Sequence, residues 1–345
     1  MIRRAALLVL LAAGLGLGWK ALPGRTPAIA GPDPIAVLDP VQIGGMTQWL
    51  LIRGQDRSAP VLLWLHGGPG AAQMPLAHAT TRALERDFVV VHWDQRGAGR
   101  SNPMGFDPAT MTLEQFLQDA HAVTRHLQAR LGGERILVLG HSWGTMLGAR
   151  LVARWPGDYA GYIGIGQQVS TARGIEATLD RIAPLIRAGG RPDHLRWLES
   201  TTPEGLLDHP AYVAMMQMLD AYGGGMNVPA GRFAGIMIRA TEYSLGDLWR
   251  WLNGANRGSG PMWPDYRRRD LLADVTEMPV PMLLISGAAD LNTPVELVAE
   301  WFEVVSARNG KQHVVFEHSG HAPFLTEATR FREILQGFAA DLRPD

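Results

Sequence analysis

The chain of 345 residues contains no cysteine, which excludes disulfide bridges, thiolate chemistry and zinc sites built on thiolates. Its formal net charge is only -1, so the charge balance gives no support for a nucleic acid partner. With 46% hydrophobic and 19% charged residues, the composition is that of a globular protein with a sizeable core. The length exceeds what one compact domain needs, which favours a core with an inserted subdomain.

Long apolar runs are absent except at the amino terminus, where the uncharged residues 5–19 follow Arg3 and Arg4. Such a run is short for a membrane-spanning helix and typical of a signal peptide, with a possible cleavage site at residues 28–30 (Ala-Ile-Ala). If it is not cleaved, it would anchor the protein with its catalytic part on the far side of the membrane, since the two arginines favour the cytoplasm. We therefore expect residues 1–30 to be a signal peptide or membrane anchor with its linker, on an exported (periplasmic or extracellular) or membrane-anchored protein.

Residues 140–144, Gly-His-Ser-Trp-Gly, are the most informative segment. An apolar run at 136–139 precedes them and a helix-like segment at 146–154 follows, which is the context of a nucleophile elbow. Small residues on both sides let the backbone adopt strained angles without a Cβ clash. Ser142 is therefore predicted to be a nucleophile. The alternative is a glycine-flanked serine in an ordinary loop between strand and helix.

Enzymes built on this turn present serine, then an acid, then histidine along the chain. Asp290 follows the apolar run 280–285, and His321 follows the run 313–316 and precedes the final helix. A neutral imidazole can take the serine proton while a carboxylate fixes its tautomer. We predict a catalytic triad of Ser142, Asp290 and His321.

Other histidines offer rival interpretations. His318 could be the base, but Gly320 gives His321 the better hinge for projecting its ring. The pair lacks the carboxylates or cysteines of a zinc site, so we predict no metal and no cofactor. His141 is expected to be a packed, hydrogen-bonded histidine of the scaffold. An aspartate nucleophile is disfavoured because the elbow carries serine.

An oxyanion hole needs two converging backbone N–H groups. One comes from the residue after the nucleophile, Trp143. The second is expected from residues 66–70, a glycine-rich loop after the apolar run 61–65, because glycine lets the backbone approach a substrate closely. We expect His66 to order this loop rather than to transfer protons.

Taken together, the motifs resemble the proline iminopeptidase branch of the α/β-hydrolases. The matching segments span most of the chain: residues 66–70 (His-Gly-Gly-Pro-Gly), 94–101 (Asp-Gln-Arg-Gly-Ala-Gly-Arg-Ser), 140–145 (Gly-His-Ser-Trp-Gly-Thr), Asp290 and 319–321 (Ser-Gly-His). The resemblance implies that Gly68 and Trp143 are the oxyanion donors and that amino-terminal residues are released from peptides. It also implies that residues 94–101 shape the floor of the site, although a tight turn fixed by Arg96 is the simpler interpretation.

The chain departs from that family where substrate is bound. The family carries paired tryptophans followed by glutamate in its cap, whereas residues 249–253 read Trp-Arg-Trp-Leu-Asn. Glu242, Trp249 and Trp251 are the candidate substrate-binding residues, with Glu204 and Asp247 as alternative carboxylates, although a surface carboxylate on a helix is the simpler interpretation. The sequence therefore leaves two main interpretations: aminopeptidase activity on short peptides, and carboxylesterase or lactonase activity on small acyl esters. A catalytically silent binding protein on the same fold is a remote third.

The predicted fold class is α/β: an α/β-hydrolase fold with a mostly parallel sheet, helices on both faces and an inserted helical cap. A hairpin is expected over residues 41–53 with its turn at glycines 44 and 45, then strands near 61, 88, 135 and 162 alternating with helices near 76–86, 112–131 and 145–154. We expect the core to occupy residues 31–169 and 277–345 and the cap residues 170–276. Methionine and aromatic side chains of the cap are expected to supply part of a pocket wall.

Overall fold

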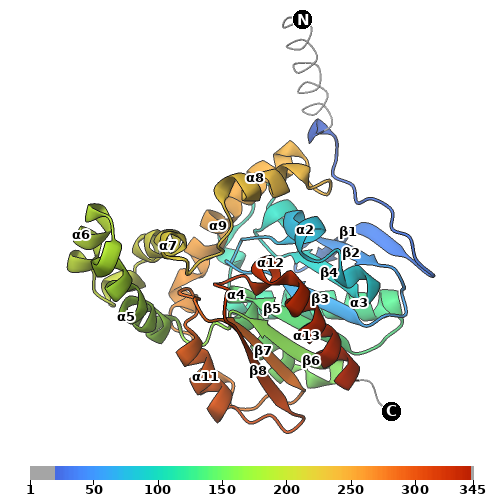
Figure 1. Cartoon of the computed structure of the whole chain (residues 1–345). Coiled ribbons are helices and arrows are strands. Elements are labelled where there is room, and N and C mark those ends of the chain that lie inside the picture. Colours follow the sequence, from blue (N-terminus) through green and yellow to red (C-terminus); the bar gives the residue numbers. More distant parts are fainter. Residues whose placement is uncertain (1–19, 343–345) are drawn as a thin grey trace, which may run out of the picture.

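A single twisted sheet organises the computed structural model, which describes residues 20–342 (Figure 1). The predicted apolar leader at residues 1–19 lies outside this range. Within it, eight strands pair in the order β1-β2-β4-β3-β5-β6-β7-β8. The pairs β1·β2 and β2·β4 are antiparallel, and every other pair is parallel. The mostly parallel sheet predicted for the fold class is confirmed.

Most strands lie close to the predicted positions, but the first hairpin begins at Ile35 and not at residue 41. They are β1 (Ile35–Ile43), β2 (Met46–Gly54), β3 (Val61–Leu65), β4 (Val89–Asp94), β5 (Ile136–His141), β6 (Tyr159–Ile165), β7 (Met282–Gly287) and β8 (Lys311–Phe316). The predicted turn between β1 and β2 falls at Gly44 and Gly45, whose φ angles of 55° and 81° suit a tight hairpin.

Both faces of the parallel strands are buried under helices. In β3, Leu63 and Leu65 join one apolar cluster with side chains of α3 (Leu113–Leu131), α4 (Trp143–Arg154) and α11 (Val295–Val304). Leu62 and Trp64 point the other way and pack with α13 (Ala328–Asp341). Alternate residues therefore serve opposite cores, which explains why these strands are apolar throughout.

The helix expected over residues 76–86 is broken into short pieces, which corrects the prediction. The chain forms η1 (Met74–Leu76), α2 (Ala77–Thr80) and η2 (Leu84–Arg86). The Thr80 and Thr81 hydroxyls donate to the carbonyls of Leu76 and Ala77, and Thr81 also hydrogen-bonds His92 at 2.8 Å. Threonine hydroxyls that bond locally in this way compete with regular helix, and here the α-helical segment stops at Thr80.

Between β6 and β7 the elements are helical, as the sequence pattern predicts. They are α5 (Thr171–Gly189), α6 (Pro192–Ser200), η6 (Gly205–Leu207), α7 (His209–Met218), η7 (Leu219–Tyr222), α8 (Ala230–Arg239), α9 (Leu245–Tyr266) and α10 (Leu271–Asp274). Figure 1 shows α5, α6 and α7 projecting to one side, whereas α8 lies near the amino-terminal end of the described chain. None of the helices in residues 20–342 is long and apolar enough to cross a bilayer.

A buried ion pair fastens the first hairpin to helix α3. The Arg96 guanidinium contacts Asp119 at 2.8 Å and donates to the Gly44 carbonyl at 2.7 Å. Gln48 and Gln115 donate to the same carboxylate, each at 2.7 Å. The carboxylate thus has several donors, which offsets the cost of removing both charges from water.

We expect Asp119→Ala to lower the free energy of unfolding by about 3–5 kcal/mol, because it leaves the Arg96 charge buried without a partner. The matched control on the same helix is Glu114→Ala, which removes a solvent-exposed pair with Arg154 and should cost at most about 1 kcal/mol. Urea denaturation followed by circular dichroism measures both. Equal losses for the two variants would contradict this account of the Arg96 pair.

Candidate active site

Ser142 occupies a strained turn between β5 and α4. Its φ and ψ angles are 55° and -123°, and non-glycine residues rarely adopt a positive φ. The Ser142 N–H donates to the Ile165 carbonyl at 3.0 Å. A Cβ at Gly140 would lie 2.4 Å from the Gly144 carbonyl oxygen, and one at Gly144 would lie 2.1 Å from the Leu65 carbonyl oxygen. The two glycines are required because backbone meets backbone on both sides of the serine.

Asp290 and His321 form a buried pair on two other loops. Asp290 follows β7, and His321 lies between β8 and α12 (Pro323–Thr326). The His321 Nδ1 contacts Asp290 Oδ2 at 2.8 Å. Asp290 Oδ1 accepts from the backbone N–H groups of Asn292 and Thr293 at 2.8 and 3.0 Å. The Thr293 hydroxyl donates to Oδ2 at 2.7 Å.

These contacts keep the Asp290 carboxylate ionised. Burial alone would raise the pKa of Asp290, but the His321 ring and the Thr293 donors together hold it below its usual value. An ionised acceptor at Nδ1 places the His321 proton on that nitrogen and leaves Nε2 as the basic atom. The rival candidate, His318, is exposed and forms no hydrogen bond or ion pair with Asp290 among the described residues.

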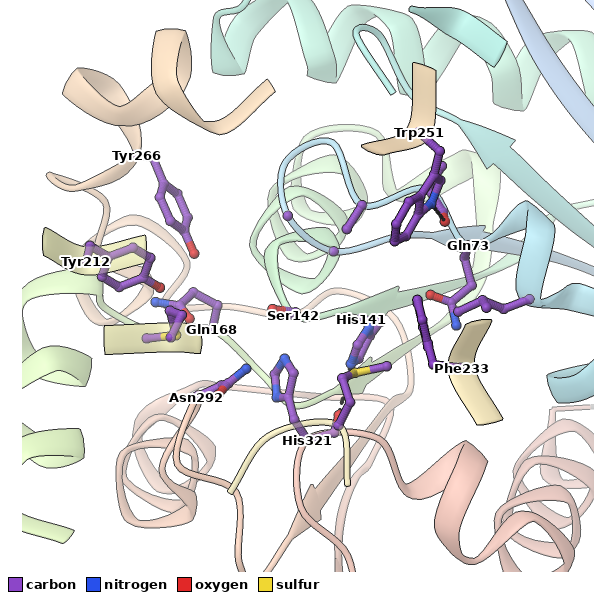
Figure 2. Close-up of a pocket in the computed structure, with 17 residues that line it drawn as sticks. Gln73, His141, Ser142, Gln168, Tyr212, Phe233, Trp251, Tyr266, Asn292 and His321 are labelled. Carbon is purple, nitrogen blue, oxygen red and sulfur yellow. Dashed lines mark hydrogen bonds between the residues drawn. The ribbon is translucent and has the colours of Figure 1, made fainter. Parts of the chain in front are cut away.

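Ser142, His321 and His141 lie on the wall of one cavity of about 320 Å³ (Figure 2). Within residues 20–342 the Ser142 hydroxyl has no hydrogen-bond partner. His141 is buried, as expected, and its Nε2 hydrogen-bonds the His321 carbonyl at 2.9 Å, although its ring edge also reaches the cavity. The structure therefore brings the predicted nucleophile and base to a common space.

The loop proposed for the second oxyanion donor adjoins the same cavity. Gly67 and Gly68 line it, and Gly68 has a φ of 116°. A Cβ at Gly68 would lie 2.5 Å from the Gly70 nitrogen, so only glycine fits. In the described part of the chain the Gly68 N–H has no acceptor. Trp143 is the first residue of α4, where backbone N–H groups have no partner within the helix.

Gln95 is a residue that the sequence analysis did not single out, and it joins these two segments. Its side-chain nitrogen donates to the His66 carbonyl at 3.0 Å, and its side-chain oxygen accepts from the Trp143 indole at 3.1 Å. Its backbone N–H donates to His66 Nε2 at 3.1 Å. The His66 ring therefore orders the loop, as expected. The available signal for Gln95 was its place in the matched segment 94–101, directly after the end of β4.

The remaining cavity wall is mostly apolar, and seven of its twelve residues come from the segment between β6 and β7. It is lined in addition by Ala71, Ala72, Gln73, Leu76, Gln168, Tyr212, Met216, Met226, Phe233, Trp251, Tyr266 and Asn292. Two polar atoms of this wall, Gln73 Nε2 and Asn292 Oδ1, are buried without a protein partner. Such atoms are available for hydrogen bonds with a bound molecule.

Of the predicted substrate-binding residues, the structure places only Trp251 in this wall. Its indole donates to the Ala72 carbonyl at 2.8 Å. Trp249 faces outward and is 54% exposed. Glu242 is buried in the connection between α8 and α9 and does not line the cavity, so the expectation of a surface carboxylate is corrected. Asp247 is buried as well, because it closes the capping box of α9 with Ser244.

No group of three or more histidine, aspartate or glutamate side chains in residues 20–342 is arranged to hold a metal ion. Three buried histidines instead remain neutral in the fold. Burial lowers the pKa of His66 to about 4 and that of His92 to about 3. Burial and the neighbouring His321 lower the pKa of His141 to about 3.

Comparison with known proteins places this geometry in context. The profile described as "Alpha/beta hydrolase family" matches residues 62–334. The chain is 29% identical over 311 residues to the probable aminopeptidase YbaC of Bacillus subtilis, covering 88% of this chain and 96% of that protein. It is 24% identical to a proline iminopeptidase of Lactobacillus delbrueckii subsp. lactis, over 85% of this chain and 94% of that protein. The crystal structure of the Mycobacterium smegmatis proline iminopeptidase superposes with a TM-score of 0.65 at 24% identity, over 89% of this chain and 98% of that one.

The three neutral histidines predict a steep loss of stability in acid. Each ring gains a proton on unfolding once the pH is below its ordinary pKa of about 6.5, so the unfolded state binds more protons between about pH 6.5 and pH 4. As the pH is lowered through that window, the free energy of unfolding should therefore decrease by about 1.4 kcal/mol per pH unit for each ring.

The variant His92→Gln, away from the cavity, should reduce that slope by about 1.4 kcal/mol per pH unit. Urea denaturation at a series of pH values measures it. Above pH 7.5, where all three rings are neutral in both states, the variant and the parent should respond to pH alike. An unchanged slope between pH 6.5 and pH 4 would show that His92 is not held neutral by the fold.

Proposed function

Because this chain belongs to the alpha/beta hydrolase family and is a hydrolase, we propose that it is a serine hydrolase acting by acyl transfer. The observation that carries the proposal is the shared cavity: a serine at φ 55° and a histidine bound to a buried carboxylate lie on one wall. A serine hydroxyl and a basic ring nitrogen that reach one cavity are the pair of groups that nucleophilic catalysis needs.

In the proposed reaction, Ser142 Oγ attacks the substrate carbonyl carbon and His321 Nε2 takes the hydroxyl proton. Asp290 stabilises the imidazolium through Nδ1, and the N–H groups of Gly68 and Trp143 bind the carbonyl oxygen as it becomes negative. His321 then protonates the leaving group, which departs and leaves an acyl enzyme. A water molecule, deprotonated by His321, releases the acid and restores Ser142.

The cavity wall favours an uncharged, apolar acyl group. None of the residues that line it in the described part of the chain is an aspartate or glutamate. A free amino terminus is a cation, and binding it in an apolar wall without a carboxylate leaves its charge desolvated and unpaired. We therefore propose a carboxylester or lactone of a small apolar acid as the preferred substrate.

Release of an amino-terminal residue, such as proline, from a short peptide is the second candidate. The names of the relatives favour it, since they include a probable aminopeptidase and proline iminopeptidases that align over most of their length. The amino group would then have to be held by neutral acceptors. Asn292 Oδ1, which is buried at the wall without a partner, is one such acceptor.

We expect Ser142→Ala to lower kcat/KM by about 10⁴-fold or more and to abolish labelling by a fluorophosphonate probe, because the nucleophile is lost. Asp290→Asn should lower kcat by about 10⁴-fold, whereas the probe should still label Ser142, at a slower rate. The control Ser58→Ala removes an exposed loop hydroxyl and should retain full labelling. Full activity of Ser142→Ala would exclude the mechanism.

The substrate class is tested by comparing a butyrate ester, a prolyl anilide and its amino-acylated form. We expect the ester to be turned over with a kcat/KM at least about tenfold above that of the prolyl anilide, since the unpaired ammonium costs the anilide binding energy. Acylating the amine should then raise turnover of the anilide. If acylation instead abolishes turnover, the enzyme recognises a free amino terminus and the second candidate holds.

A further inference from the structure

The outer face of α8 and α9 carries an unusual concentration of exposed apolar side chains. Of the eight large apolar side chains that are exposed in residues 20–342, four lie between residues 238 and 252. Ile238 is 64% and Leu252 69% exposed, and Leu245 and Trp249 accompany them. Residues 245, 249 and 252 are spaced four and three apart, so they form one stripe along α9.

The charges around this stripe are positive. Arg232 and Arg239 on α8 are exposed, and Arg250 on α9 is partly exposed. Glu242 and Asp247 of the same segment are buried. Asp247 pairs with Arg250 at 3.0 Å, so Arg232 and Arg239 carry the positive charge that has no ion-pair partner in the described chain. Apolar side chains flanked by arginines characterise helices that lie in a membrane interface, where the cations meet anionic headgroups.

The amino-terminal end of the described chain meets this same segment. Lys20 Nζ donates to the carbonyl of Tyr243 at 3.0 Å and to that of Ala240, and the Arg25 N–H donates to the Thr241 carbonyl at 2.9 Å. Leu22, another of the eight exposed apolar side chains, lies between them. In sequence, Lys20 directly follows the uncharged apolar residues 5–19. Lys20, the residue that follows the apolar run, is therefore held against the connection between α8 and α9.

The linker after Lys20 also belongs to the fold. Arg53, which is buried and paired with Glu85 at 2.7 Å, donates to the Pro27 carbonyl at 2.7 Å and to the Thr26 hydroxyl. Cleavage after residue 30 would remove both acceptors from a buried guanidinium. Buried donors that lose their partners cost stability, which favours a chain that keeps its leader.

We propose that residues 5–19 are retained as a membrane anchor and that the outer face of α8 and α9, with Ile238, Leu245, Trp249 and Leu252, rests on the surface of the same bilayer. The partner is a lipid surface with anionic headgroups, which contact Arg232 and Arg239. The docked face is the back of the cavity wall, because Phe233 and Trp251 on the same two helices line the cavity.

The absence of cysteine provides a direct test, since an introduced cysteine is the single thiol in the chain. The full chain with Leu252→Cys is labelled with an environment-sensitive fluorophore and reconstituted in vesicles of phosphatidylcholine and phosphatidylglycerol. The matched control is Val304→Cys on α11, whose parent side chain is 61% exposed. We expect nitroxide-bearing lipids to quench the label at position 252 several-fold more than at 304, and aqueous iodide to do the reverse.

Trp249→Cys serves as a second reporter if Leu252→Cys does not fold, as judged by its unfolding transition. Equal quenching at 252 or 249 and at 304 would overturn the docking surface even if residues 5–19 are inserted. Energy transfer between labelled copies without lipid quenching would overturn it in favour of a second copy. The mass of the membrane-purified chain should include residues 1–19, and a shorter mass would overturn the anchor.

Discussion

The contact between backbone atoms around Ser142 is the constraint on which the rest of the site depends. Helix α4 starts so close to β3 and β5 that no side chain fits at Gly140 or Gly144, and the serine between them is driven to a positive φ. That close approach holds only because the two apolar cores on either face of the sheet fix strand and helix in place. The strained backbone of Ser142 is therefore maintained by the packing of many side chains in these two cores.

The other site groups reach the cavity because of sheet topology. β5, β7 and β8 are parallel, so the loops that carry Ser142, Asp290 and His321 all leave from one edge. The segment between β6 and β7 then covers that edge and supplies part of the apolar wall. His321 is held from this side as well, since its N–H donates to the Gly225 carbonyl at 2.8 Å. The segment between β6 and β7 and the proposed base, His321, are therefore directly connected by a hydrogen bond.

Sequence reasoning predicted the fold class because strand length, apolar alternation and glycine turns are local properties, and the family match confirms it. It also selected the residues that meet in the cavity, because motif order in this family fixes which loops converge; their catalytic roles and the boundaries of the cap stay predictions. It could not place Glu242 or Trp249, because whether these side chains point into the cavity or away from it depends on how α8, α9 and their connection pack. Gln95 was missed for a related reason, since its partners are remote in sequence.

Gln95 connects the two segments that carry the proposed oxyanion donors. One side-chain amide holds the His66 loop with its nitrogen and the Trp143 indole with its oxygen. A displacement of either segment therefore pulls on the other through a planar, inextensible group. The segment that leads into Gly68 and the start of α4 are therefore held in one arrangement by a single side chain that is remote from both in sequence.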